Sequence, residues 1–203
     1  MPKPKKILLA DNRDDYRETT KEYLQLQGYA VAEVASPEAC LQIIETDLPH
    51  VAILDYRLRY DDDEYDDSGL TLAQRLPERL PKILLTAYPK PEMARDALRV
   101  NDQGLPLVAG LVFKYEPLEV LHEYVKQTFD KEVRLNWDLQ IVGLEQDALS
   151  LIRWLEPTLV AEQAAQRCEE WEDLLCRLFL EATRIELEQV LWQPAGQVAY
   201  RLP

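Results

Sequence analysis

Four side chains that can take part in phosphoryl transfer stand at the ends of short apolar runs. They are Asp11 after ILLA, Asp55 in VAILD, Thr86 in KILLT and Lys114 in GLVFK. A carboxylate can attack a phosphoryl group as a covalent nucleophile. The phosphoryl oxygens then need neutralisation, usually by magnesium on carboxylates together with a lysine. These four residues predict a phosphoacceptor (Asp55), a metal ligand (Asp11), a neutralising charge (Lys114) and a hydroxyl that senses the phosphate (Thr86).

The elements that must position these residues alternate between two kinds. Apolar runs cover residues 7–10, 29–35, 51–55, 82–86 and 110–114, and amphipathic stretches cover Asp14–Gln27, Ser36–Thr46, Gly69–Arg79, Pro89–Arg99 and Pro117–Phe129. Strands that are apolar throughout are typical of a parallel sheet covered on both faces. The pattern predicts an α/β fold with a doubly wound five-stranded parallel sheet, whose ligand site lies at the carboxyl ends of the strands. The four side chains are therefore expected at one edge of the sheet.

The motifs ILLADN, VAILDYRL, LLTAY and VFKYEP follow in this order within about residues 5–128. Together they resemble the receiver domain of bacterial two-component response regulators, which has a flavodoxin-like fold. The resemblance implies magnesium-dependent transfer of a phosphoryl group from a histidine kinase to Asp55. It also implies that the main-chain carbonyl of Arg57 completes the metal shell, and that Ala87 stands beside Thr86 in the phosphate-sensing loop.

Two residues depart from the family pattern. Asn12 stands where the family usually has a second acid, so the site loses one negative charge, although an amide oxygen can still face magnesium. Leu111 stands where the family often has a switch aromatic, so signalling by tyrosine rotation is not expected. The segment between Arg99 and the last strand is also longer than usual.

The loop after Asp55 is roughly six residues longer than usual and carries six acids in seven positions, 61–67. Runs of like charge are usually solvated, so we expect this loop to extend into solvent. The functional alternative is that Asp61, Asp62 and Asp63 act as auxiliary acids and compensate for Asn12 by adding cation affinity near the pocket.

The composition excludes several function classes. The 203 residues carry a formal charge of −14, which argues against binding to nucleic acids or to anionic membranes. No run is long enough for a membrane span or a signal peptide. The three cysteines (Cys40, Cys168 and Cys176) are scattered and read as buried thiols. We expect a cytoplasmic protein. His50 and His122 lie away from the strand-end edge and are expected to be structural.

After the receiver-like region, residues 1–129, the pattern changes to a small, mainly helical α+β region, residues 130–203. We expect a strand over 133–141, helices over Leu144–Leu155 and Pro157–Ala182, and a hairpin around Gln193–Gly196. Four tryptophans in this region are expected in a core or an interface. Such a small sheet has unpaired edges, so we expect either that a second chain covers them, as in a homodimer, or that the sequence belongs to a longer protein.

Three functions remain open on the sequence. The first is a phosphorylation-controlled response regulator with an interaction module that does not bind DNA and whose protein partner is unknown. The second is a pseudo-receiver that keeps the fold as a constitutive interaction scaffold. The third, a transcription factor, is disfavoured by the acidity and by the lack of a basic recognition helix. We expect no enzymatic activity beyond self-phosphorylation from a phosphodonor, because residues 130–203 contain no recognisable catalytic motif.

Overall fold

A computed structural model describes most of the first two thirds of the chain and parts of the rest. The described residues are 4–47, 49–100, 106–133, 135, 137, 139–142, 167, 173–180, 182–186, 190–192 and 199–200. The chain divides into two compact units, residues 4–133 in one and residues 1–3 with 134–203 in the other. All candidate site residues belong to the unit formed by residues 4–133.

This unit is built on a parallel sheet of five strands in the order β2-β1-β3-β4-β5. The strands are β1 (Lys6–Ala10), β2 (Ala30–Val34), β3 (Val51–Asp55), β4 (Lys82–Thr86) and β5 (Gly110–Phe113). Every residue of β3 and β4 is buried, as expected for inner strands covered on both faces. The predicted doubly wound α/β fold is confirmed.

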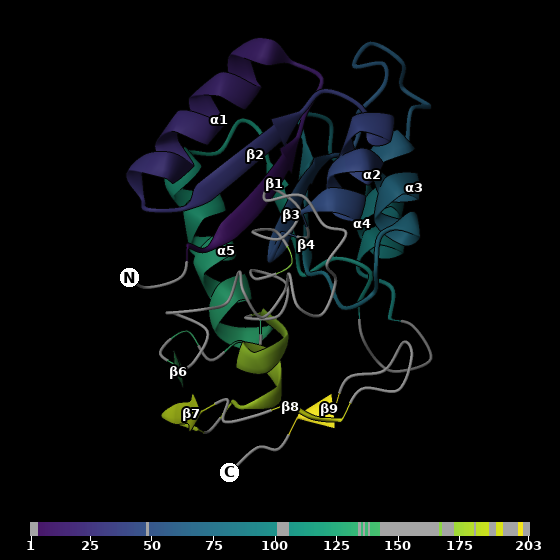
Figure 1. Ribbon diagram of the computed structural model, residues 1–203. Helices are drawn as coiled ribbons and strands as arrows, with labels where there is room; N and C mark the ends of the chain where they lie inside the picture. Colours follow the sequence, from purple (N-terminus) through teal and green to yellow (C-terminus); the bar gives the residue numbers. More distant parts are fainter. Residues whose placement is uncertain are drawn as a thin grey trace. The chain divides into compact units, whose positions relative to one another are not determined.

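Five helices cover the two faces of the sheet. They are α1 (Asp14–Leu26), α2 (Pro37–Thr46), α3 (Ser68–Arg75), α4 (Pro91–Ala97) and α5 (Leu118–Lys131). Figure 1 shows α2, α3 and α4 on one side of the sheet and α1 with α5 on the other. On the first side, side chains of the helices join Leu8, Leu54 and Leu84 of the strands in one apolar cluster.

Local chemistry explains where two of these helices begin and end. Ser36 caps α2, because its Oγ accepts a hydrogen bond from the Ala39 amide at 3.3 Å, and Pro37 occupies the first turn. The amphipathic pattern predicted a helix as far as Arg79, but α3 ends at Arg75. The reason is Pro77, which forces the preceding residue, Leu76, into an extended conformation with ψ of 153°.

The register of the strands brings their carboxyl ends together. Asp55 pairs with Leu85, and Thr86 pairs with Phe113, so that Lys114 follows directly beyond β5. The Lys114 amide donates to the Thr86 carbonyl at 2.8 Å, which extends the ladder past the last paired residues. Asp11, immediately after β1, donates its amide to the carbonyl of Val34 on β2 at 3.1 Å.

The second unit contains four short strands among its described residues. β6 (Gln140–Val142) pairs in parallel with β7 (Arg184–Glu186), and β8 (Val190–Trp192) pairs antiparallel with β9 (Ala199–Tyr200). Residues 167 and 173–178 are helical.

Two expectations for residues 133–203 need correction, and one strand pairing was not expected. Within the range predicted as a strand, 133–141, the described residues 133, 135, 137 and 139 are not strand and β6 begins at Gln140, because alternation of side chains does not by itself supply a pairing partner. The helix predicted to reach Ala182 ends at residue 178. The parallel pairing of β6 with β7 was not expected. The predicted helix Leu144–Leu155 and the turn Gln193–Gly196 lie outside the described residues. None of the helices in the described part of the chain is long and apolar enough to cross a bilayer.

Candidate functional site

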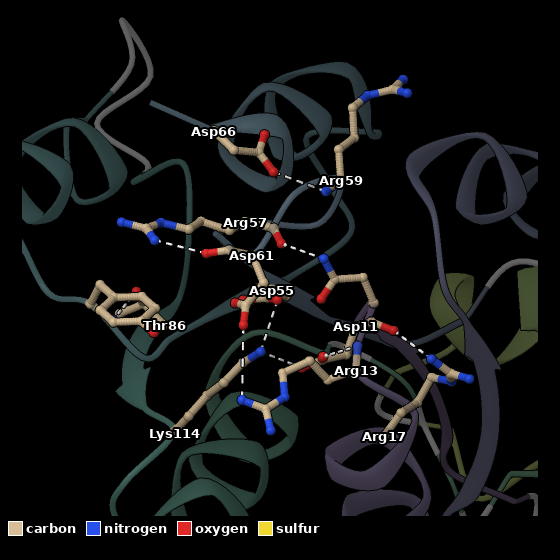
Figure 2. Close-up of polar contacts among 12 residues, drawn as sticks. Asp11, Arg13, Arg17, Asp55, Arg57, Arg59, Asp61, Asp66, Thr86 and Lys114 are labelled. Carbon is tan, nitrogen blue, oxygen red and sulfur yellow. Dashed lines mark hydrogen bonds and ion pairs between the residues drawn. The ribbon is translucent and has the colours of Figure 1, made fainter. Parts of the chain in front are cut away.

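The centre of the site is an ammonium group held between two carboxylates. Lys114 Nζ lies 2.7 Å from Asp11 Oδ2 and 2.8 Å from Asp55 Oδ2, as Figure 2 shows. The Lys114 side chain is only 7% exposed, and the two carboxylates are 0% and 3% exposed. Charges so far from water interact strongly, so the loss or movement of any one of them is felt by the other two.

Burial controls the acidity of Asp55. Desolvation, opposed by the Lys114 charge and reinforced by the charge of Asp11, raises the pKa of Asp55 to about 7. The Asp55 carboxyl is thus poised near neutral pH. A divalent cation beside it would favour the ionised form, which is the nucleophilic one.

Asn12 and the Arg57 main chain form the second part of the site. Asn12 Nδ2 donates to the Arg57 carbonyl at 3.0 Å, while Asn12 Oδ1 is buried with no hydrogen-bond partner. A buried carbonyl oxygen without a donor is a suitable ligand for a hard cation. Two carboxylates and two carbonyl oxygens therefore fit magnesium by donor class. The Arg57 carbonyl, however, already accepts the Asn12 amide.

The loop between β1 and α1 is held rigidly around Asp11. Asp11 Oδ1 accepts the Arg13 amide at 2.9 Å, and the Arg17 guanidinium donates to the Asp11 carbonyl at 2.8 Å. Arg17 is in turn paired with Asp14 and, at 3.4 Å, with Glu33 on β2. These contacts fix the direction of the Asp11 carboxylate before any ligand arrives.

The first turn of α3 packs directly on the end of β3. Gly69 donates its amide to the Tyr56 carbonyl at 2.9 Å, and a Cβ at Gly69 would stand 1.7 Å from the Asp55 carbonyl oxygen. Only glycine allows so close an approach. The sequence analysis placed Gly69 at a helix start but did not recognise this constraint on Asp55.

The Thr86 hydroxyl is buried beside the loop that follows β4. Its Oγ1 accepts the Tyr88 amide at 3.1 Å, and the residue is 1% exposed. Ala87, half-buried, separates Thr86 from the exposed Tyr88. In this arrangement the Thr86 hydroxyl oxygen accepts a hydrogen bond from its own loop, and the hydroxyl can still donate its own proton to another acceptor.

The acid-rich loop is folded rather than extended, which corrects the expectation for one of its members. Asp66 is buried and accepts the amides of Arg59, Tyr60 and Ser68 at 2.8 to 2.9 Å. Against the effect of burial, these hydrogen bonds lower the pKa of Asp66. Sequence reasoning failed here because it counted charges and did not consider the main-chain amides that a turn exposes.

Of the auxiliary acids, Asp62 and Asp63 are exposed, and Asp61 is partly buried with its carboxylate 3.8 Å from Arg13. Among the residues that the structure describes, no three carboxylate, imidazole or thiol side chains gather to hold a metal ion. A cation at this edge would depend on Asp11, Asp55 and carbonyl oxygens.

Side chains of the loops join the acid-rich loop to the loop that follows β4. The Arg57 guanidinium donates to the Asp61 carbonyl at 2.8 Å and lies 4.3 Å from the centre of the Tyr88 ring. Lys90 Nζ donates to the Glu64 carbonyl at 3.1 Å. The two loops therefore form one wall of the site.

The histidines and cysteines have other surroundings. His50 is buried and accepts the Lys6 amide on Nδ1 at 2.9 Å, and His122 lies edge-on to the rings of Tyr23 and Tyr29. Cys40 and Cys176 are buried thiols, and Cys168 lies outside the described residues.

The sequence model of the response regulator receiver domain family matches residues 7–126, which is more than half of the chain. No curated protein sequence matches. A CheY-like receiver domain protein from Methanospirillum hungatei JF-1 is 25% identical with a TM-score of 0.54, and the match covers 64% of this chain and 97% of that one.

Two further solved structures agree in fold. A protein assigned as a response regulator from Chloroflexus aurantiacus J-10-fl is 27% identical with a TM-score of 0.51, over 64% of this chain and 100% of that chain. A response regulator from Thermotoga maritima is 15% identical with a TM-score of 0.52, over the same shares, and supports the fold alone. The chain belongs to the response regulator receiver domain family of two-component signalling.

Proposed function

We propose that this chain is a response regulator that accepts a phosphoryl group on Asp55 and thereby changes the interactions of a module that does not bind DNA. Membership of the family implies a histidine kinase as the phosphodonor partner. The observation that carries the proposal is the buried Lys114 ammonium held between Asp11 and Asp55. It supplies fixed positive charge where phosphoryl oxygens would develop negative charge.

In the proposed reaction, an ionised Asp55 oxygen attacks the phosphorus of the donor. A bond from phosphorus to Asp55 forms, the bond from phosphorus to the donor atom breaks, and the donor leaves with that bond's electron pair. Lys114 stabilises the phosphoryl oxygens. The Thr86 hydroxyl, whose oxygen accepts the Tyr88 amide, donates a hydrogen bond to a phosphoryl oxygen, which draws its loop inward.

Asp11, Asp55, the Arg57 carbonyl and the amide oxygen of Asn12 would hold magnesium. When bound, the ion supplies charge neutralisation and alignment for phosphoryl transfer. The Arg57 carbonyl, which accepts the Asn12 amide, would offer its second lone pair to the ion.

The proposed output is an interaction surface. Movement of the Thr86 loop would displace Tyr88, whose ring stacks with Arg57. It would therefore also change the wall that this loop forms with the acid-rich loop. A local electrostatic change would thus act on a larger surface. The net charge of −14 supports a protein partner over a nucleic acid. We also propose a cytoplasmic location, on the basis of the implied kinase partner.

Intact-mass spectrometry after incubation with acetyl phosphate and magnesium tests the proposal. The wild-type chain should gain one phosphate, Asp55→Asn should gain none, and Asp62→Asn, which neutralises an exposed acid nearby, should behave as wild type. Equal labelling of wild type and Asp55→Asn would contradict the assignment of Asp55.

The pseudo-receiver remains a second candidate because of one observation, the hydrogen bond from Asn12 to the Arg57 carbonyl. In that case an internal donor satisfies the Arg57 carbonyl, one of the oxygens that would otherwise face a cation. Thermal unfolding with increasing magnesium separates the two functions, since only a site that binds the cation is stabilised by it. A melting temperature independent of magnesium up to millimolar concentrations, together with no phosphate adduct, would favour the scaffold.

A further inference from the structure

The Lys114 ammonium has a third neighbour besides the two carboxylates. The Tyr16 ring centre lies 5.0 Å from Lys114 Nζ, within the range of an attractive contact between a cation and an aromatic face. Tyr16 is half-buried in the first turn of α1, which begins two residues earlier at Asp14. The ammonium is thus enclosed by Asp11, Asp55 and an aromatic ring.

We propose that Tyr16 is a positioning residue that holds the Lys114 ammonium at the phosphoacceptor through the face of its ring. The inference rests on the proposed function and names a residue that governs it. It does not follow from the motifs of the sequence, since none of them includes Tyr16.

The ring can fill this role because it stays uncharged. Burial raises the pKa of Tyr16 to about 12, so the phenol is neutral at pH 7. A neutral ring attracts the ammonium without competing for its charge, as a third carboxylate would. It also keeps water from an ammonium whose side chain is only 7% exposed, which keeps the local electrostatic interactions strong.

The contact between the Tyr16 ring and Lys114 matters most when Asp55 changes its charge. After phosphorylation the Asp55 carboxylate becomes a neutral acyl group, and the negative charge moves outward onto the phosphoryl oxygens. One of the two ionic contacts of Lys114 is then replaced by a contact farther from β3. The Tyr16 ring does not change in this step. It can therefore keep the ammonium in place before and after transfer.

A purely structural role for Tyr16 makes different predictions. If the ring only filled space on α1, loss of the ring would lower stability equally whether or not Lys114 is present. If the ring holds the ammonium, the two residues are energetically coupled. The coupling is measurable in the unphosphorylated protein and does not depend on the proposed function.

The first test is a double-mutant cycle on the full chain with Tyr16→Leu, Lys114→Met and the double variant, followed by urea unfolding at pH 7. We expect the unfolding equilibrium constant to show a coupling of about threefold to thirtyfold. Tyr16→Phe, which keeps the ring, should retain the coupling to Lys114. Additive effects within error would overturn the inference, whatever the outcome for phosphorylation.

The second test measures the rate of phosphate uptake from acetyl phosphate. The carboxylate of Asp55 displaces acetate, so one phosphate is gained and one acetate released. Tyr16→Leu should lower this rate about tenfold, and Tyr16→Phe should restore most of it. Tyr23→Leu, a matched loss of a ring on α1 beside His122, should leave the rate unchanged. An unchanged rate in Tyr16→Leu would overturn the inference. No uptake by the wild-type chain would instead contradict the proposed function, and the cycle would still decide the role of Tyr16.

Discussion

The ionised form of Asp55, which is the nucleophile, is the form that burial disfavours in the folded protein. Because burial raises the pKa of Asp55 to about 7 from an ordinary 3.8, the folded protein binds the proton more tightly than the unfolded chain does. The corresponding stability is fully present below about pH 4 and is lost as the pH rises towards 7. Above that pH, the ionised Asp55 weakens the fold in the absence of a cation.

We therefore expect Asp55→Asn to stabilise the protein at pH 8 in the absence of divalent cations, on the order of 2–4 kcal/mol. The amide resembles the protonated carboxyl and carries no buried charge. At pH 4 the difference should nearly vanish. Urea unfolding of both proteins at the two pH values measures it. A gain of the same size at both pH values would show that the Asp55 charge is not the cause.

Asn12 lies next to Asp11 and donates its side-chain amide to the Arg57 carbonyl. Asn12→Asp adds a carboxylate beside two others and removes the amide from the Arg57 carbonyl. We expect the affinity for magnesium to rise at least about tenfold, and stability without magnesium to fall. Isothermal titration and thermal unfolding with magnesium measure both effects.

The control for Asn12→Asp is Gln25→Glu, which adds one negative charge at an exposed position of α1. The control should leave magnesium binding unchanged. Unaltered binding in Asn12→Asp as well would contradict the view that the Asn12 amide limits the metal affinity of this site.

At the residue scale, sequence reasoning placed Asp11, Asp55, Thr86 and Lys114 at one edge, because parallel strands bring their carboxyl ends together. The sequence does not indicate which side chains donate to the same oxygen atoms. The Asn12 hydrogen bond and the Tyr16 ring both depend on the path of the chain between β1 and α1. That path is set by Arg17 and Glu33, which lie on different elements.

At the scale of elements, the approach of α3 to β3 depends on one glycine. A Cβ at Gly69 would meet the Asp55 carbonyl oxygen at 1.7 Å, so Gly69→Ala must push α3 away from the site. We expect a loss of at least about 3 kcal/mol of stability or failure to fold. Gly28→Ala is a matched control, because Gly28 has φ of 91° but nothing within 4 Å of an added Cβ.

The Gly28→Ala control should cost only about 1 kcal/mol, from backbone strain alone. Circular dichroism and urea unfolding compare the two variants. Equal losses would mean that α3 can yield without strain, and that the close packing of Gly69 does not constrain Asp55.

The acid-rich loop is the element for which charge counting was least informative. Asp66 holds three main-chain amides, whereas Asp62 points into solvent. Asp66→Asn should cost about 1–2 kcal/mol, because a carboxylate hydrogen bonded to several amides is replaced by a group with one acceptor oxygen. Asp62→Asn should change stability by less than about 0.5 kcal/mol. Urea unfolding of the two variants measures this, and equal effects would contradict the folded-loop description.

Features set by neighbours in sequence, such as helix ends, can be predicted locally, whereas strand partners cannot. Ser36 and Pro37 signal the start of α2 correctly, because a cap is formed by neighbours in sequence. The amphipathic pattern overran the end of α3 because it ignored Pro77. The pairing of β6 with β7 joins segments more than forty residues apart, and no local pattern specifies such a partner.

At the scale of the whole molecule, the unit of residues 4–133 contains the complete five-stranded sheet and the five helices that cover it. The unit extends four residues beyond the boundary of 129 expected from sequence. Val133 is buried, and its amide donates to the Thr128 carbonyl at 3.2 Å, so these last residues belong to the packing of α5.

We therefore expect a fragment of residues 1–133 to fold alone and to take up phosphate at the rate of the full chain, because the contacts that the structure describes at the site join residues of this unit. A fragment cut at 129 removes Val133 and the last two residues of α5, and should be less stable by about 1–3 kcal/mol. Urea unfolding and intact-mass spectrometry of the two fragments test this. An unfolded 1–133 fragment would show that the receiver depends on residues 134–203 for stability. A folded fragment with altered phosphate uptake would instead show that those residues regulate the site.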